Sequence, residues 1–154
     1  MDLQSIISNQ VAQERAERLK NSEQMTLGEM IIKLESIIER IKDKEKDRPE
    51  YQDPEVKFDF EYLRPTGLSS WRGSYDELAI EFSGEGEWIK ASQFIAMLKE
   101  AVGKTYTGYK GGDFVMGKST PMWVANYGNS GNTGVYNLSY DGYFIVIETG
   151  HCEF

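Results

Sequence analysis

The most constraining feature of this 154-residue sequence is an amphipathic helix that we expect from Thr26 to about Lys42. Thr26 and Glu29 have the spacing of a capping box, in which two side chains satisfy free backbone amides at a helix start. The apolar residues that follow recur at helical spacing and share one face. They are Leu27, Met30, Ile31, Leu34, Ile38 and Ile41. This face must be buried against a sheet or against a partner.

The segments on either side of this helix predict an extension and a linker. Residues 2–21 read as a polar helix whose apolar stripe is too narrow for a core, so it is either a frayed extension or a contact for another subunit. We therefore divide the chain into an N-terminal helical extension, residues 1–24, and a domain, residues 25–154. The run KDKEKDRPEYQDP at 42–54 has dense mixed charge and two prolines, which predicts the helix end and a solvated linker.

The rest of the domain reads mainly as strands. Alternating apolar residues predict strands at 56–60 and 78–82, with a loop between them. A short helix at 94–102 should end at Gly103, which suits a C-terminal cap. Further strands are expected at 105–109, 114–116 and 122–127, and a hairpin joins 135–140 to 143–149 around Asp141-Gly142. This order predicts an α+β fold, an antiparallel β-sheet with packed helices.

Charge limits the classes of ligand. The formal net charge of −8 argues against nonspecific binding to DNA, RNA or an anionic membrane. An anionic ligand therefore needs a local reversal of charge. Residues 104–128 provide one, with three lysines against the single carboxylate of Asp113, and the run 62–75 contains Arg64 and Arg72 but no acid.

The sequence also predicts a cytosolic protein. No segment approaches the roughly 18 consecutive apolar residues of a membrane span, and MDLQSIISNQ lacks the features of a signal peptide. The lone Cys152 permits no internal disulfide, in keeping with a reducing compartment.

Two glycine-rich and aromatic stretches, 68–78 and 104–128, are the candidate ligand site. Glycines allow the backbone to approach a ligand, rings offer stacking faces, and cations suit phosphates. For the rings and for Arg72, ordinary packing and surface pairing are alternatives of similar weight. The candidate ligand-binding residues are Trp71, Arg72, Tyr75, Tyr106, Tyr109, Lys110, Gly111, Gly112, Phe114, Asn126 and Tyr127.

Catalytic and metal chemistry find little support. Gly112–Ser119 fits the phosphate-binding P-loop pattern, but Thr120-Pro121 and a strand pattern follow where that fold needs a helix. The single histidine, His151, and the single cysteine, Cys152, are neighbours and form no triad with a separate orienting residue. No cluster of His and Cys suggests a metal site. We expect neither a catalytic residue nor a metal or cofactor.

A family resemblance gives a sharper hypothesis. The succession TLGEMIIKLE, FDF, SWRGSYDELAIEF, QFIAMLKEAVGKT, TGYKGGDFVMG, TPMWVANYG and IVIET, from about Thr26 to the C-terminus, resembles the first type of Thoeris anti-defence protein encoded by phages. The resemblance implies a non-enzymatic sponge in the cytoplasm of an infected bacterium. It would sequester cyclic ADP-ribose isomers, and in some members cyclic oligonucleotides, without cleaving them.

The resemblance also implies a homodimer or hexamer, with pockets shared by adjoining subunits. A general pocket role then falls on Arg72, Tyr109, Lys110, Phe114 and Asn126. The long N-terminal helix departs from the family pattern and leaves the oligomeric state open. Two alternatives are a nucleotide-processing enzyme that uses the Gly112–Ser119 loop and a module that binds a host protein through exposed aromatic residues.

Overall fold

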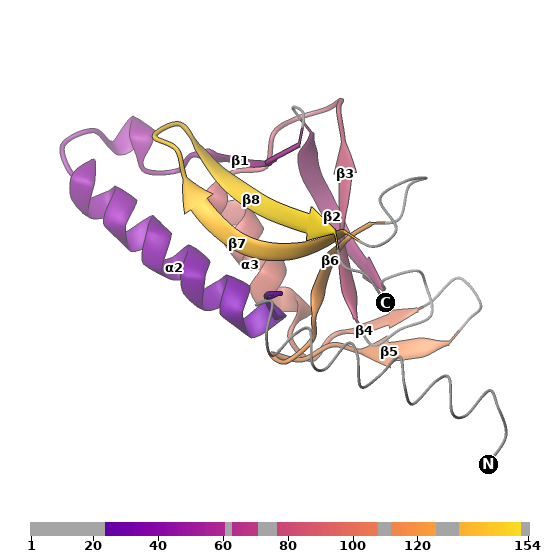
Figure 1. Cartoon of the computed structure of the whole chain (residues 1–154). Coiled ribbons are helices and arrows are strands. Elements are labelled where there is room, and N and C mark those ends of the chain that lie inside the picture. The colour runs from indigo at the N-terminus through magenta and orange to yellow at the C-terminus, as the bar shows by residue number, and fades with distance from the viewer. Residues whose placement is uncertain (1–23, 61–62, 71–76, 108–111, 126–132, 152–154) are drawn as a thin grey trace, which may run out of the picture.

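The computed structural model describes residues 24–60, 63–70, 77–107, 112–125 and 133–151. These residues form an α+β fold in which helices pack on a six-stranded sheet beside a small two-stranded hairpin (Figure 1). The helices are α2 (Leu27–Lys44), α3 (Ala91–Ala101) and the short 3-10 helix η1 (Pro49–Tyr51). The strands are β1 (Glu55–Phe58), β2 (Arg64–Ser70), β3 (Leu78–Ser83), β4 (Thr105–Thr107), β5 (Asp113–Val115), β6 (Met122–Val124), β7 (Thr133–Tyr140) and β8 (Phe144–His151).

The main sheet is mixed, so the prediction of an antiparallel sheet was wrong. Its strand order is β1-β8-β7-β6-β3-β2. The pairs β1–β8 and β3–β6 are parallel, and the other pairs are antiparallel. Parallel neighbours need long connections, and these pairs join segments far apart in the chain. Local periodicity identifies such strands but does not reveal their direction relative to a distant partner.

The sheet curves until its two edge strands approach each other. The Phe58 amide at the end of β1 donates to the Leu63 carbonyl just before β2, at 3.1 Å. The result is a nearly closed, barrel-like sheet. Phe58 also stacks on Phe60, with ring centroids 4.9 Å apart, and meets Phe82 of β3 edge-on. The aromatic side chains therefore fill the place where the two edges meet.

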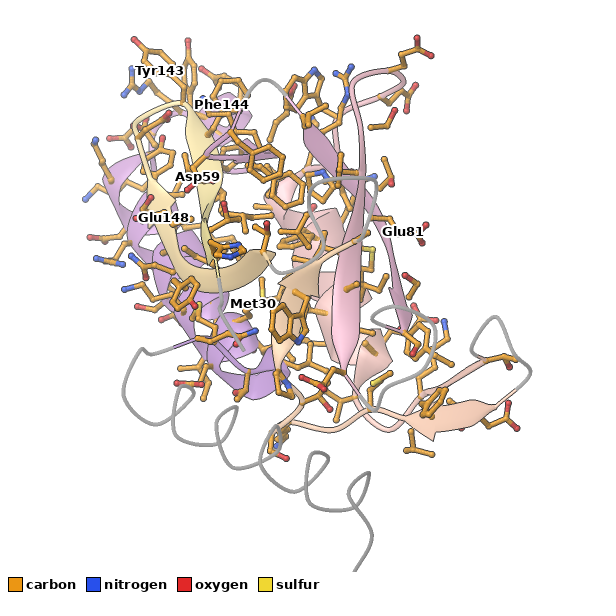
Figure 2. All side chains as sticks on the ribbon, turned by 45° about the vertical axis from the view of Figure 1, so that its right-hand side comes forward. Met30, Asp59, Glu81, Tyr143, Phe144 and Glu148 are labelled. Atoms are coloured by element: carbon orange, nitrogen blue, oxygen red, sulfur yellow. The ribbon has the colours of Figure 1, made fainter. Side chains whose placement is uncertain are left out.

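Helix α2 confirms the expected start and buried face. Thr26 Oγ1 accepts from the Glu29 amide at 3.2 Å, and Glu29 Oε1 accepts from the Thr26 amide at 3.0 Å, so the capping box is complete. Leu27, Met30 and Leu34 are fully buried, and Figure 2 shows Met30 between α2 and the sheet. The helix lies against β7 and α3.

Strand β2 occupies part of the segment that the sequence presents as a loop. Residues 64–70 pair with β3, although a register shift interrupts the ladder between Pro65 and Gly67. Proline and glycine normally argue against a central strand. Here Pro65 is tolerated because β2 is at the end of the strand order, where one side of the strand needs no ladder partner.

The turns expected at Gly103 and Gly142 are present. Gly103 follows α3 with φ +80°, a conformation that glycine adopts without steric cost. Gly142 has φ +99° in the β7–β8 turn, where Asp141 Oδ1 accepts from the amides of Tyr143 and Phe144 at 2.8 and 2.7 Å. These contacts fix the tip of the long hairpin.

The segment after α2 is less simple than a solvated linker. Helix α2 continues to Lys44, and η1 follows at Pro49–Tyr51. Glu45 is buried and pairs with Arg48, whose Nη2 lies 2.6 Å from Glu45 Oε2. Arg48 in turn lies over the Tyr51 ring, 4.9 Å from its centroid. Local pairing therefore orders this charged stretch.

A second small cluster lies apart from the main core. Trp123 of β6 is fully buried with Ala79 and Ala125, and Tyr136 packs against them. Trp123 Nε1 donates to the buried carboxylate of Glu77 at 2.9 Å. Both side-chain faces of β3 are therefore covered, which the simple alternation expected at 78–82 does not predict.

Candidate functional site

The structure describes three of the eleven predicted ligand-binding residues, namely Tyr106, Gly112 and Phe114. The other eight lie outside the described residues: Trp71, Arg72, Tyr75, Tyr109, Lys110, Gly111, Asn126 and Tyr127. The N-terminal extension also lies outside them, apart from Gln24, which is buried and donates to the Met122 carbonyl at 3.0 Å.

The three described residues belong to the hairpin β4–β5 and its approach. Tyr106 and Phe114 are direct cross-strand partners, and both pack against the main core. The neighbouring pair, Thr107 and Asp113, is joined by a hydrogen bond from Thr107 Oγ1 to Asp113 Oδ1 at 3.0 Å. The rings therefore contribute to packing, which the sequence left as an alternative to ligand stacking.

A cation accompanies the Tyr106 ring. Lys104 Nζ lies 5.2 Å from the ring centroid, within the range of a cation–π contact. Burial raises the pKa of the Tyr106 phenol above its ordinary value, and the Glu100 carboxylate raises it further. Tyr106 is therefore a neutral ring at physiological pH.

The Gly112–Ser119 segment does not have the surroundings of a P-loop. It contains β5 and a turn, and the next element is the strand β6. The Lys118 and Thr120 carbonyls accept from the amides of Gly28 and Leu27, both at 2.8 Å. The end of this segment and the residue that follows it thus present carbonyls to the start of α2, whereas a P-loop presents amides to a phosphate. Those contacts also occupy the amides that an anion at this helix start would need.

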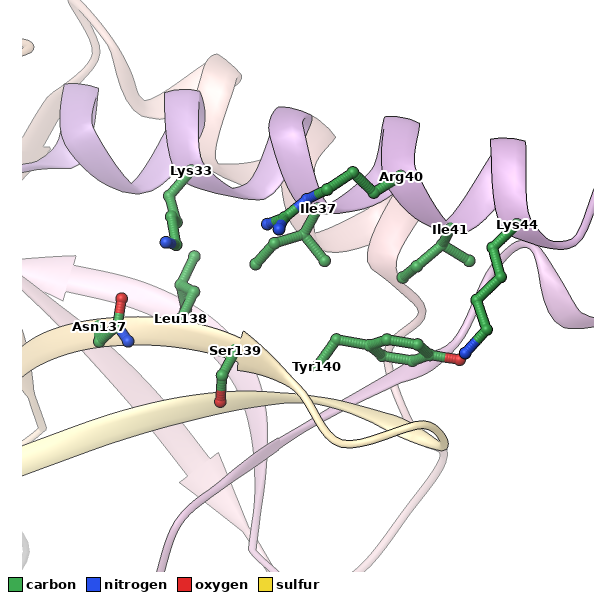
Figure 3. Close-up of a pocket in the computed structure, with 9 residues that line it drawn as sticks. All are labelled: Lys33, Ile37, Arg40, Ile41, Lys44, Asn137, Leu138, Ser139 and Tyr140. Atoms are coloured by element: carbon green, nitrogen blue, oxygen red, sulfur yellow. The ribbon is translucent and has the colours of Figure 1, made fainter.

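A groove between α2 and β7 has features that the sequence did not single out (Figure 3). Its volume is about 340 Å³. Ile37 and Ile41 of α2 and Leu138 of β7 are buried residues that form its apolar lining. Lys33, Arg40 and Lys44 line the same groove from α2. Cations are therefore set beside an apolar lining in a chain of net charge −8.

The charge of the three groove cations is not neutralised by any described side chain. Among the described residues, no hydrogen bond or ion pair engages the side chain of Lys33, Arg40 or Lys44. By contrast, Lys99 of α3 pairs with Glu35 at 3.0 Å on another side of α2. At about 1.5 Å of rise per residue, Lys33 and Lys44 lie about 16 Å apart along the helix. The positive charge therefore runs along the groove.

The end of the groove near Lys44 carries an aromatic ring. Figure 3 shows the Lys44 side chain extending toward the hydroxyl end of Tyr140. The Tyr140 hydroxyl donates to the Gly142 carbonyl at 3.0 Å, which orients the ring. Burial raises the pKa of Tyr140, Glu45 and Asp141 raise it further, and Arg48 opposes them. The ring is therefore neutral at physiological pH, and its face can stack on a ligand without adding negative charge.

Polar groups of β7 complete the wall opposite α2. Asn137 and Ser139 line the groove, and Asn137 Nδ2 donates to Glu148 Oε2 at 3.0 Å. This bond holds the amide group in place. The groove thus combines cations, a ring and fixed polar groups, as small-molecule sites commonly do.

Sequence reasoning missed the groove because α2 and β7 are distant in the chain. A partial signal exists: Lys33, Ile37, Arg40, Ile41 and Lys44 follow the i, i+4, i+7, i+8, i+11 repeat of one helix stripe. That stripe predicts cations beside an apolar face, but it does not predict which strand forms the other wall. No residue of β4 or β5 lines the groove, and in Figure 1 the β4–β5 hairpin lies apart from β7, so the groove and the hairpin do not form one site.

The described residues contain no group of three or more His, Cys, Asp and Glu side chains placed to hold a metal ion. His151 is exposed at the end of β8. In the same part of the chain, no helix is long and apolar enough to cross a membrane. Comparison with known proteins gives no relative: no family model, curated protein or solved structure matches the chain.

Proposed function

We propose that this protein binds a small phosphate-bearing ligand of nucleotide size and holds it without chemical change. The observation that carries the proposal is the α2–β7 groove, in which Lys33, Arg40 and Lys44 have no partner among the described residues. In a chain of net charge −8, these three cations without a described partner form a local positive patch that attracts an anion. Phosphate is the anion that such cations commonly bind in proteins.

The geometry favours retention over turnover. The groove offers donors and a stacking ring, and the residues that line it include no carboxylate or histidine that could activate the Ser139 hydroxyl as a nucleophile. The Tyr140 ring and the Asn137 amide are already held in position before a ligand binds. Preorganisation of this kind favours affinity because little further order is lost on binding.

The resemblance of the sequence to phage Thoeris anti-defence proteins gives this proposal its specific form. The ligand would be a cyclic ADP-ribose isomer or a related cyclic oligonucleotide that serves as an immune signal. The protein would act in the infected cell as a homodimer or hexamer that lowers the free concentration of the signal. Tight capture without cleavage requires the protein in amounts comparable to the signal.

The decisive experiment identifies what the protein holds and what it releases. Purified protein is incubated with cyclic ADP-ribose isomers, cyclic oligonucleotides and ordinary nucleotides, and the bound fraction is released by heat and identified by mass spectrometry. We expect at least one phosphate-bearing ligand to be retained and released intact. Recovery of a linear or hydrolysed product would instead identify an enzyme.

Substitutions locate the binding site. Arg40→Ala or Lys33→Ala should weaken binding by about 1.5–3 kcal/mol, the range for hydrogen bonds to charged groups. Lys42→Ala is the matched control, because Lys42 is exposed on the same helix but does not line the groove. Arg72→Ala and Lys110→Ala test the predicted loops in the same assay. Losses confined to these last two variants would move the site from the groove to the loops.

A second candidate function is the binding of a host protein. Tyr143 is 82% exposed and Tyr51 is 55% exposed, and large exposed rings are common at protein interfaces. A pulldown from host lysate with nucleotides removed separates the two candidates. Only the interaction module would retain a defined partner under that condition and lose it when Tyr143 is changed to Ser.

A further inference from the structure

A second, larger cavity adjoins the groove at the tip of the β7–β8 hairpin. Its volume is about 670 Å³, and we call it the basin. Lys44 and Tyr140 line both cavities, so the groove and the basin meet at these two residues. Figure 2 shows Tyr143 and Phe144, which also line the basin, at the tip of the hairpin.

The basin differs from the groove in charge, because four carboxylates line it beside the cations Lys44, Arg48 and Lys90, whereas the groove is lined by cations without a carboxylate. Glu45 is paired with Arg48, and Asp53 accepts from the Ser92 amide and hydroxyl at 2.8 and 2.6 Å. Glu50 and Glu55 also line the basin, and neither side chain is bonded to another described residue. These two carboxylates can accept hydrogen bonds from hydroxyl or amino groups, whereas they would repel a phosphate.

Neighbouring side chains hold the Phe144 ring, which forms part of the aromatic wall of the basin. Lys57 Nζ lies 5.0 Å from the centroid of the Phe144 ring, and the Trp88 ring lies 5.5 Å from it. Arg64 lies over Trp88 at 4.4 Å and donates to the Gly84 carbonyl. A chain of cation–π and ring contacts thus fixes Phe144 beside the exposed ring of Tyr143.

We propose that one ligand spans both cavities, with its phosphates in the groove and its nucleoside in the basin. This inference rests on the proposed function. It adds that the ligand is a ribonucleoside phosphate and states how the ligand is oriented. The ribose hydroxyls and the base amino groups donate hydrogen bonds to the carboxylates of Glu50 and Glu55. The base stacks on the rings of the basin, and Tyr140 and Lys44 contact the ligand where its two halves join.

The test measures the binding of separate halves and of the whole ligand by calorimetry. The probes are inorganic pyrophosphate, the four common ribonucleosides and their 5′-diphosphates, each titrated into the full chain. We expect at least one nucleoside diphosphate to bind at least tenfold more tightly than pyrophosphate. The corresponding nucleoside alone should bind more weakly than pyrophosphate, because it has no phosphate to occupy the groove.

Paired variants separate this inference from the proposed function. Glu55→Gln and Tyr143→Ala should weaken the diphosphate severalfold and leave pyrophosphate unchanged, whereas Arg40→Ala should weaken both. Glu50→Gln provides a second basin variant at an exposed position, where folding is insensitive to the change. Equal affinity for pyrophosphate and every diphosphate, with no effect of the basin variants, would overturn the inference while the proposed function stood. Failure of every phosphate probe to bind would overturn both.

Discussion

At the scale of single residues, Gly28 shows how packing can reverse a helix propensity. Alanine is normally favoured over glycine inside a helix by about 1 kcal/mol. A Cβ at Gly28, however, would lie 2.9 Å from the Lys118 carbonyl oxygen, which is backbone and cannot move aside freely. We predict that Gly28→Ala lowers the free energy of unfolding by about 1–3 kcal/mol, measured by urea denaturation.

Gly117→Ala is the control for this change. A Cβ at Gly117 would meet no atom within 4 Å, and this glycine has no positive φ. Its substitution should leave the unfolding midpoint nearly unchanged. A Gly28→Ala variant as stable as the native chain would show that α2 can shift away from Lys118 at little cost.

Tyr106 gives a prediction of pH dependence at the same scale. Its pKa is raised in the folded protein by burial and by Glu100, above an ordinary value of 10.0 that applies to the unfolded chain. Between these two pKa values the folded state keeps a proton that the unfolded state has lost, so stability falls as pH rises through this window. Below pH 10 both states are protonated, and the full stability is present.

We predict that Tyr106→Phe makes the loss of unfolding free energy shallower above pH 10, because phenylalanine has no proton to lose. Denaturant melts of the variant and the native chain from pH 8 to 11.5 measure the difference. Tyr143→Phe, at a ring that is 82% exposed, serves as the control. Identical profiles for Tyr106→Phe and the native chain would refute the shift at Tyr106.

At the scale of elements, local signals proved the most informative. The capping box of α2 and the Asp141-Gly142 turn each involve residues within a few positions, so the sequence alone predicted them. Strand β2 was missed because Pro65 and Gly67 look like loop residues, and only its pairing with β3 makes that segment a strand. The α2–β7 groove was missed because its two walls come from segments distant in the chain.

The capping box predicts a measurable contribution to the stability of α2. Thr26→Ala removes the oxygen that accepts from the Glu29 amide, and loss of such a cap costs about 0.5–2 kcal/mol. Thermal unfolding should therefore show a lower midpoint for Thr26→Ala. Thr26→Ser keeps the accepting oxygen and should retain most of the stability. Equal loss in both variants would assign the effect to the Thr26 methyl group instead of the cap.

At the scale of the whole molecule, the acidic charge and the cationic groove respond to salt in opposite ways. The chain has a net charge of −8, so screening by salt reduces its self-repulsion and should stabilise the free protein. A ligand that binds only the folded state adds about 2.7 kcal/mol at one hundred times its Kd. Screening weakens the attraction between its phosphates and the exposed cations that supply this gain.

We therefore predict that raising KCl from 0.05 to 1 M increases or preserves the melting temperature of the free protein. The further rise in melting temperature that the bound nucleotide causes should become smaller over the same range. The physical reason is that the Debye length contracts to about 3 Å at 1 M, so a ligand phosphate is attracted by the cation that it contacts and hardly by the other cations along α2. Differential scanning calorimetry with and without ligand measures both effects in one series. Sodium chloride at equal ionic strength controls for a specific effect of potassium. If the ligand shift stays constant across this range, hydrogen bonds and stacking hold the ligand, and Lys33, Arg40 and Lys44 contribute no net electrostatic affinity.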